Sequence, residues 1–199
     1  MGLNSSIELP NSYESLDQTL KTADLILSDA VPNATTLFHT PVVSSFDGKE
    51  IISRVMVLRE FSLTKRLMRF HTDYRSAKIK QFRSSDVASI VGYDPDIKIQ
   101  IKLHGKIKVY YDDDIAKSAW KESSGRSKKC YSVKGGSSKE ISEPSAYDIQ
   151  DFEVEDGYKN FAVLIFTFDS LEFLYLKSSG HRRAIHKWKN NLKSTWLVP

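Results

Sequence analysis

The sequence predicts a mainly β (α+β) domain in which six or more antiparallel strands form a barrel, with short helices at its flanks. Strand-like segments follow one another at short spacing, and only short helical segments separate them. Parallel neighbours would need a crossover of a dozen or more residues, so antiparallel pairing is expected. A chain of 199 residues with 40% hydrophobic residues is also long enough to bury a substantial core.

The N-terminal part of the chain divides into a flexible end and a helix. We expect residues 1–11 to be flexible, residues 12–30 to form the helix, and residues 34–199 to form the main domain. Within 12–30, apolar residues recur at helical spacing and Ser12 is placed to cap the first turn. The sequence Val-Pro-Asn-Ala at 31–34 then breaks the helix.

Two strands and a turn come next. Residues 35–46 and 50–62 have strand character and flank Asp47-Gly48-Lys49, which is a hairpin signal. Simple alternation along 50–62 places Arg54 and Arg59 on opposite faces. Both could therefore reach one ligand only at a barrel mouth or a subunit interface.

The rest of the chain continues this pattern. Strands are expected at 66–72, 86–94 and 97–111, and helices at 76–85 and 112–123. Residues 123–149 are polar and rich in Ser and Gly, which predicts a loop or lid. Residues 161–177 predict two strands with a turn at Asp169-Ser170, and a basic, aromatic tail follows from 181 to 199.

Composition narrows the possible partners. A net charge of +4, from 29 basic and 25 acidic residues, permits local basic pockets but does not indicate nucleic acid. Cys130 is the only cysteine, which excludes an internal disulfide and a thiolate metal site and favours a reducing, cytoplasmic location. No apolar run approaches the roughly 20 residues of a membrane span. We also find no spacing of catalytic triads, paired carboxylates or metal-binding histidines.

The junction between the strand at 66–72 and the helix at 76–85 concentrates polar side chains. Thr72, Arg75, Ser76 and Lys78 lie within seven residues, where the helix begins. A helix N-terminus presents free N–H groups and the positive end of the helix dipole, which favours an anion. The alternative is an ordinary solvated helix start.

Four stretches, in order, resemble one known family. They are Ser53 to Arg59 (SRVMVLR), Phe70 to Lys78 (FHTDYRSAK), Ile99 to Ile107 (IQIKLHGKI), and the end HRRAIHKW with the terminal WLVP. The chain resembles the pyridoxamine 5'-phosphate oxidase family. That resemblance implies a split β-barrel that binds flavin mononucleotide (FMN), usually as a homodimer with the flavin at the subunit interface.

The resemblance also implies a site. Arg59, Ser127 and Arg182 would hold an anionic small-molecule substrate, and Ser137 would reach the cofactor from the partner subunit. The cofactor-binding residues implied are Arg54, Val55, Met56, Val57, Arg59, His71, Thr72, Ser76, Lys78, Gln100 and Ser137.

This chain departs from the family pattern at several positions. Ala77 stands where the family's oxidases have a phosphate-binding Arg, and Arg75 is the candidate to compensate for it. Leu174 occupies the position of the family's Trp beside the flavin ring, and Ala184 occupies the position of the central His in the family's substrate-binding run. The cofactor half of the pattern is thus kept better than the substrate half.

The sequence therefore predicts an FMN-dependent oxidoreductase of unspecified substrate. An authentic pyridoxamine or pyridoxine 5'-phosphate oxidase and a non-catalytic flavin-binding module are the two alternatives. A barrel that binds no flavin and serves as an interaction protein is a third.

Overall fold

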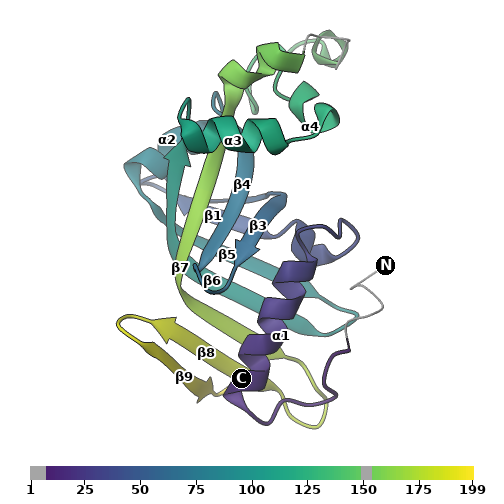
Figure 1. The fold of residues 1–199 in the computed structure, drawn as a ribbon, viewed down its shortest axis with the longest axis vertical. Coiled ribbons are helices and arrows are strands. Elements are labelled where there is room, and N and C mark those ends of the chain that lie inside the picture. The colour runs from purple at the N-terminus through teal and green to yellow at the C-terminus, as the bar shows by residue number, and fades with distance from the viewer. Residues whose placement is uncertain (1–7, 149–153) are drawn as a thin grey trace.

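A computed structural model describes residues 8–148 and 154–199, which form one antiparallel sheet of nine strands with helices around it (Figure 1). The strands are β1 (Val42–Phe46), β2 (Ile51–Val55), β3 (Leu58–Ser62), β4 (Leu67–Asp73), β5 (Val87–Asp94), β6 (Ile99–Tyr110), β7 (Phe161–Tyr175), β8 (Arg182–Trp188) and β9 (Leu192–Leu197). The helices are α1 (Leu16–Asp29), α2 (Ala77–Ser84), α3 (Asp114–Glu122) and α4 (Gly125–Lys129), with short 3-10 turns at Leu37–His39, Pro144–Tyr147 and Val154–Asn160.

The strand order is β2-β1-β5-β6-β7-β4-β3, with β8 pairing β7 and β9 pairing β8. The predicted mainly β fold of six or more antiparallel strands is confirmed. Within the described residues β2 and β3 are not paired, so the barrel is split, as the resemblance to the known family implied. The sheet stays split between these two strands.

Strand β7 is continuous, which corrects the predicted turn at Asp169-Ser170. In the β6–β7 register Phe168 lies opposite Gly105 and Ser170 opposite His104, so Asp169 is an extra residue in a bulge. A Cβ on Gly105 would overlap the Thr167 carbonyl oxygen and lie 2.6 Å from the Phe168 Cα. Asp169 and Ser170 thus lie within a continuous strand, because Gly105 on β6 leaves room for the backbone of β7 at the bulge.

The expected strand at 50–62 is two strands. β2 ends at Val55 and β3 begins at Leu58, and the Met56 N–H donates to the Pro41 carbonyl at 3.1 Å. Because β2 and β3 lie at opposite ends of the strand order, the chain crosses between them at Met56 and Val57. Alternation along one strand therefore does not apply to Arg54 and Arg59.

Helix α1 confirms the predicted N-terminal helix but starts later than Ser12. Its N-cap is Ser15, whose hydroxyl accepts from the Gln18 N–H at 3.2 Å while the Gln18 side chain accepts from the Ser15 N–H. The buried face of α1, including Ile26 and Leu27, joins the main core beside the phenylalanines of β7. None of the helices in the described part of the chain is long and apolar enough to span a membrane.

The C-terminal tail forms a hairpin, β8–β9, which the sequence patterns did not predict (Figure 1). On β8, Arg183 pairs with the nearly buried Glu172 of β7 at 2.6 Å, and Lys102 of β6 reaches the same carboxylate at 3.1 Å. The indole of Trp188 meets the Phe168 ring edge-on at 5.6 Å. These basic and aromatic residues therefore attach the hairpin to the sheet.

His186 joins this hairpin to α1. Its imidazole is fully buried, with Nε2 3.0 Å from the Thr19 hydroxyl of α1 and Nδ1 2.8 Å from the Ser194 hydroxyl of β9. Burial lowers the pKa of His186 from 6.5 to about 4, because no charged partner compensates the lost hydration.

We predict that His186 makes the fold less stable at mildly acidic pH. The unfolded chain binds the proton near pH 6.5 and the folded chain only near pH 4, so stability is lost as pH falls through this window. Between pH 7 and 5 this group should cost about 2 kcal/mol. Urea unfolding at both pH values should show this loss reduced by that amount in His186→Gln. An equal loss in wild type and variant would contradict the assignment.

Candidate functional site

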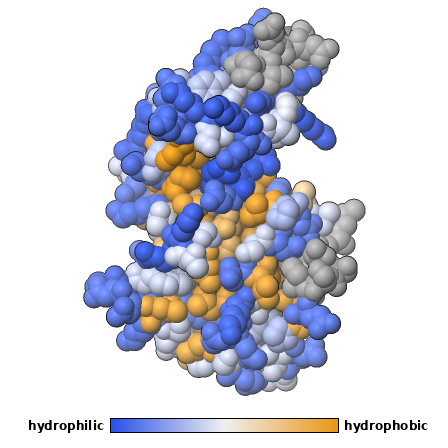
Figure 2. All heavy atoms as spheres, viewed as in Figure 1, coloured by the Kyte–Doolittle hydropathy of each residue, from blue (hydrophilic) through white to orange (hydrophobic). Residues whose placement is uncertain are grey.

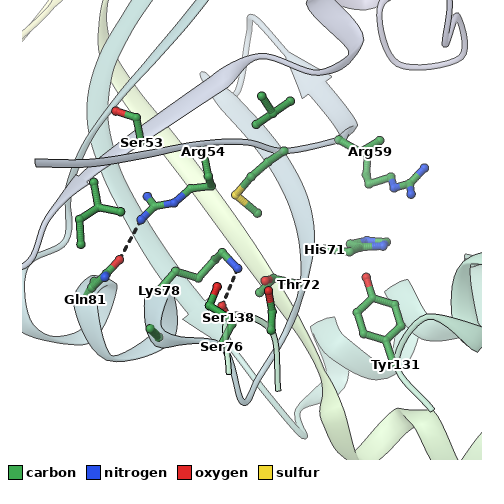
Figure 3. Close-up of a pocket in the computed structure, with 16 residues that line it drawn as sticks. Ser53, Arg54, Arg59, His71, Thr72, Ser76, Lys78, Gln81, Tyr131 and Ser138 are labelled. Atoms are coloured by element: carbon green, nitrogen blue, oxygen red, sulfur yellow. Dashed lines mark hydrogen bonds between the residues drawn. The ribbon is translucent and has the colours of Figure 1, made fainter. Parts of the chain in front are cut away.

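A cavity of about 510 Å³ opens where β2, β4 and the start of α2 meet the segment 131–138 (Figure 3). We call it the main cavity. It brings together ten of the eleven residues expected to bind cofactor: Arg54, Val55, Met56, Val57, Arg59, His71, Thr72, Ser76, Lys78 and Ser137. Arg54 and Arg59 both line it because the chain crosses between strands at Met56 and Val57.

Arg54 projects from β2 toward helix α2. Its guanidinium donates to the Gln81 side-chain oxygen and the Ser45 hydroxyl, both at 2.8 Å, and to the Val43 carbonyl at 3.3 Å. All three acceptors are uncharged, and burial lowers the pKa of Arg54. The sequence analysis did not identify Gln81 as a site residue. Helical spacing could have found it, because Gln81 lies one turn after Lys78 on the same side of α2.

Lys78 lies in the first turn of α2 and also faces the main cavity. Its ammonium donates to the Ser76 hydroxyl at 2.6 Å. Ser76 occupies the N-cap position, yet its side chain makes no capping bond. Burial, followed by repulsion from Arg54, lowers the pKa of Lys78.

Arg75, the candidate to compensate for Ala77, does not line the main cavity. Its guanidinium forms a two-pronged contact with Asp73, with distances of 2.6 and 3.0 Å. It also donates two bonds to the Val133 carbonyl, each at 3.1 Å. Arg75 therefore neutralises Asp73 and fastens the segment 131–138 to the start of α2.

The segment 131–138, which we call the strap, forms one wall of the main cavity. Besides the contact with Arg75, the Asn160 amide donates to the Tyr131 carbonyl at 2.8 Å. A Cβ on Gly136 would lie 2.7 Å from the Arg75 Cβ, so only glycine fits that approach. The strap thereby delivers Ser137 and Ser138 to the cavity of their own chain, whereas the sequence resemblance placed Ser137 at the partner's site.

His71 and Tyr131 line the other end of the main cavity (Figure 3). The His71 ring packs edge-on against Phe161 at 4.9 Å, and its buried Nε2 makes no hydrogen bond to the described residues. Burial, with Arg69 and Arg59 nearby, lowers the His71 pKa to about 3, so the ring is neutral near pH 7. Burial also raises the pKa of Tyr131. The strap carries Tyr131 to the cavity, and no local sequence pattern indicated that it would lie there.

A smaller cavity of about 340 Å³ shares Arg59 and His71 with the main one. We call it the side cavity. It contains Ser127, one of the residues expected to hold substrate. Arg69 also lines it, but pairs with Glu60 at 3.2 Å and Glu122 at 3.0 Å. Among the ion pairs of the described residues none involves Arg59, which leaves its charge available to this cavity.

Two expected site residues lie elsewhere. Gln100 sits on β6 between Tyr93 and Leu174 and does not line the main cavity. Arg182, on β8, lines a separate cavity and contacts Glu14 at 3.3 Å. A single chain therefore assembles most of the expected cofactor residues but does not bring Gln100 or Arg182 to them.

Comparison with known proteins matches residues 27–111 to the family model "Pyridoxamine 5'-phosphate oxidase, FMN-binding domain". No curated protein matches the sequence. The matched range contains the residues from Arg54 to Lys78, but not Ser127, Ser137 or Arg182. The family match thus covers most of the cofactor half of the expected site and not its substrate half.

Among solved structures, the fold is similar to an FMN-binding protein related to pyridoxamine 5'-phosphate oxidase from Nostoc punctiforme PCC 73102. The TM-score is 0.75 at 19% identity, over 90% of this chain and 97% of that one. It is also similar to PhzG from Burkholderia lata 383, solved with tetrahydrophenazine-1-carboxylic acid, with a TM-score of 0.70 at 18% identity over 92% and 90% of the two chains.

At these sequence identities the solved structures establish the fold alone, and the family model matches residues 27–111. We conclude that this chain has the split-barrel fold of pyridoxamine 5'-phosphate oxidase-like proteins, and that residues 27–111 match the FMN-binding domain of that family, as the sequence resemblance predicted.

Proposed function

We propose that the main cavity binds FMN. The observation that carries this proposal is the pair of cations, Arg54 and Lys78, held half-buried against one cavity. Among the ion pairs of the described residues, none involves either side chain. Burial disfavours both charged forms, and repulsion from Arg54 further disfavours that of Lys78. A phosphate monoester, with a charge between about −1.5 and −2 at pH 7, relieves both effects.

The lining fits the parts of FMN. Arg54, Ser76 and Lys78 would hold the phosphate at the N-terminal end of α2, with Ser138 from the strap beside them. Val55, Met56 and Val57 would supply apolar surface and backbone groups to the ring, and the unpaired His71 Nε2 offers it a neutral polar contact. Bound FMN supplies hydride and electron transfer, which the protein only orients.

We further propose an oxidoreductase activity on a small anionic substrate in the side cavity. Arg59 would provide the positive charge and Ser127 a hydrogen bond, next to the neutral ring of His71. Both cavities border Arg59 and His71, so a molecule in the side cavity would lie beside the cofactor. Turnover of pyridoxamine 5'-phosphate would identify the authentic oxidase, and flavin bound without turnover of any amine would identify a binding module.

We propose that the protein acts as a homodimer. The outer face of β1, β2 and β5 exposes apolar side chains, with 76% of Ile51 and 62% of Val55 accessible, together with Phe46 and Val87. Val55 also borders the main cavity, and Gln100 lies on the same outer face of the neighbouring β6. Pairing of two copies through this face would cover the apolar surface and offer Gln100 to the partner's cofactor.

A cytoplasmic location remains our proposal as well. It rests on the single cysteine, Cys130, which is an exposed thiol in the structure. Exposed, unpaired thiols are typical of reducing compartments.

Removal of the Lys78 charge should weaken FMN binding. We expect Lys78→Ala to lose about 1–3 kcal/mol, or about 5- to 160-fold in affinity, because a charge-assisted bond to phosphate disappears. Flavin fluorescence titration measures the affinity. Lys80→Ala removes an exposed lysine from the same helix and should leave it unchanged. Equal affinities in the wild type and Lys78→Ala would place the phosphate elsewhere.

Arg75 should act on FMN through the strap. Arg75→Ala frees the Val133 carbonyl and leaves the Asp73 carboxylate to compete with phosphate for Lys78. We expect faster trypsin cleavage after Lys134 and about a tenfold loss of FMN affinity. Arg83→Ala, which removes only an arginine stacked on Tyr74, is the matched control. Unchanged proteolysis in Arg75→Ala would show that the strap is held by other contacts.

Charge on the outer face should separate the subunits. We expect Ile51→Asp to convert a dimer to a monomer in sedimentation velocity and to lower FMN affinity, since a buried unpaired carboxylate is costly at an interface. Leu25→Asp, at an exposed apolar position on α1, is the control and should sediment as wild type. A wild-type protein that sediments as a monomer would contradict the homodimer.

A further inference from the structure

The strap places the phenol of Tyr131 at the end of the main cavity that also holds His71 (Figure 3). The Asn160 amide donates to the Tyr131 carbonyl at 2.8 Å, which holds the backbone at this point. The Tyr131 ring packs edge-on against Phe161 at 5.0 Å and against Trp120 at 6.0 Å. The phenol is therefore held in one orientation before any ligand binds.

The Tyr131 hydroxyl is a hydrogen-bond donor that lacks an acceptor. It points toward the His71 ring (Figure 3), and none of the hydrogen bonds between the described residues uses it. Burial raises the pKa of this phenol, so the hydroxyl keeps its proton near neutral pH. A ligand oxygen in the main cavity would provide the missing acceptor.

Ser123 fixes the tautomer of the neighbouring His71 ring. The Ser123 hydroxyl has a single hydrogen, which it donates to the Ala119 carbonyl at 2.8 Å. The same oxygen lies 3.5 Å from His71 Nδ1, so it accepts there and Nδ1 carries the ring hydrogen. His71 Nε2 is then an acceptor, buried and without a partner among the described residues. This end of the cavity thus combines a donor, Tyr131, with an acceptor, His71.

A donor beside an acceptor matches the polar edge of a flavin ring. That edge is an imide, in which an N–H group lies between two carbonyl oxygens, and a few such polar contacts fix the orientation of a bound ring. Gln100, the residue that the resemblance placed at the ring, does not line this cavity. Within one chain, the imide edge therefore needs other partners.

We propose that Tyr131 donates a hydrogen bond to an imide carbonyl of the bound flavin while His71 Nε2 accepts one from the imide N–H, with Ser123 as the positioning residue for His71. This inference rests on the proposed FMN site and adds the residues that recognise its ring. The bond from Tyr131 strengthens when the ring gains electrons, because a more negative oxygen is a better acceptor. Tyr131 thereby favours reduced flavin and raises its reduction potential.

Fluorescence titration of the full chain with FMN and with riboflavin separates contacts to the ring from contacts to the phosphate. Tyr131→Phe should weaken both flavins by the same factor, about tenfold, because one hydrogen bond to the ring is lost. Lys78→Ala should weaken FMN alone. Riboflavin methylated at the imide nitrogen should bind the wild type about tenfold more weakly than riboflavin, since it cannot donate to His71.

Tyr158→Phe is the matched control. The Tyr158 ring also packs edge-on against Trp120, at 5.8 Å, and its hydroxyl contacts Asp112, but it does not line the main cavity. This variant should leave the affinities for both flavins unchanged.

Two further readouts distinguish recognition of the ring from a structural role. Tyr131→Phe should lower the midpoint potential of bound FMN by about 30 mV, which corresponds to a tenfold weaker preference for the reduced flavin. Nitrogen NMR of histidine-labelled protein should show His71 with hydrogen on Nδ1 and none on Nε2. Ser123→Ala should lose this preference, and Ser123→Thr, which restores the hydroxyl, should retain it.

Several outcomes would overturn this inference and leave FMN binding intact. One is unchanged affinity for both flavins in Tyr131→Phe, and another is equal binding of riboflavin and its methylated form. A third is a lower free energy of unfolding of Tyr131→Phe with unchanged flavin affinity, which would mean that Tyr131 and His71 serve each other rather than a ligand. A wild-type chain that binds neither FMN nor riboflavin overturns the flavin site itself.

Discussion

The continuous pairing of β7 is the constraint on which the rest of the structure depends. One edge of β7 pairs with β6 along nearly its whole length, while the other edge pairs first with β4 and then with β8. Through this change of partner, β7 holds β4 along one part of its edge and the C-terminal hairpin along the next, so the hairpin and α1 join the same core. It also fixes β4, whose end carries His71 and Thr72 to the main cavity. The bulge opposite Gly105 preserves this continuity.

Charge in the site follows a simple division. Asp73 is paired with Arg75 at 2.6 Å and offsets the charge of Lys78 only in part, so burial and repulsion from Arg54 still lower the Lys78 pKa. Arg54 meets only the neutral acceptors of Gln81, Ser45 and Val43. The fold therefore holds two desolvated cations at one cavity without compensating them internally, an arrangement that lowers stability on its own and favours an anionic ligand. Ala77, by omitting a third cation, reduces this cost as well as the expected phosphate affinity.

Local patterns predicted most of the elements, and they failed where distant contacts decide the structure. The helical spacing before Asp29 was sufficient to predict α1, and the alternation of apolar residues was sufficient to predict β6, because each element buries one face. The crossing at Met56 depends on the pairing of β2 with β1 and of β3 with β4, which no local period shows. Gln81 lines the main cavity, where it accepts a hydrogen bond from Arg54, and helical spacing from Lys78 was the only sequence signal for it. Tyr131 lines the cavity because the strap carries it there, and no sequence period indicates such a contact.

The strap is attached to the residues before α2 through Arg75 and forms one wall of the main cavity. It bounds the main cavity through Ser137 and Ser138 and an adjoining cavity of about 480 Å³ through Val133 and Gly135, and Arg75 donates to its Val133 carbonyl. The main cavity thus has two distinct ends. Arg59 and His71 lie at the end shared with the side cavity, where we propose that the substrate binds, and Lys78 lies at the end where we propose that the cofactor phosphate binds.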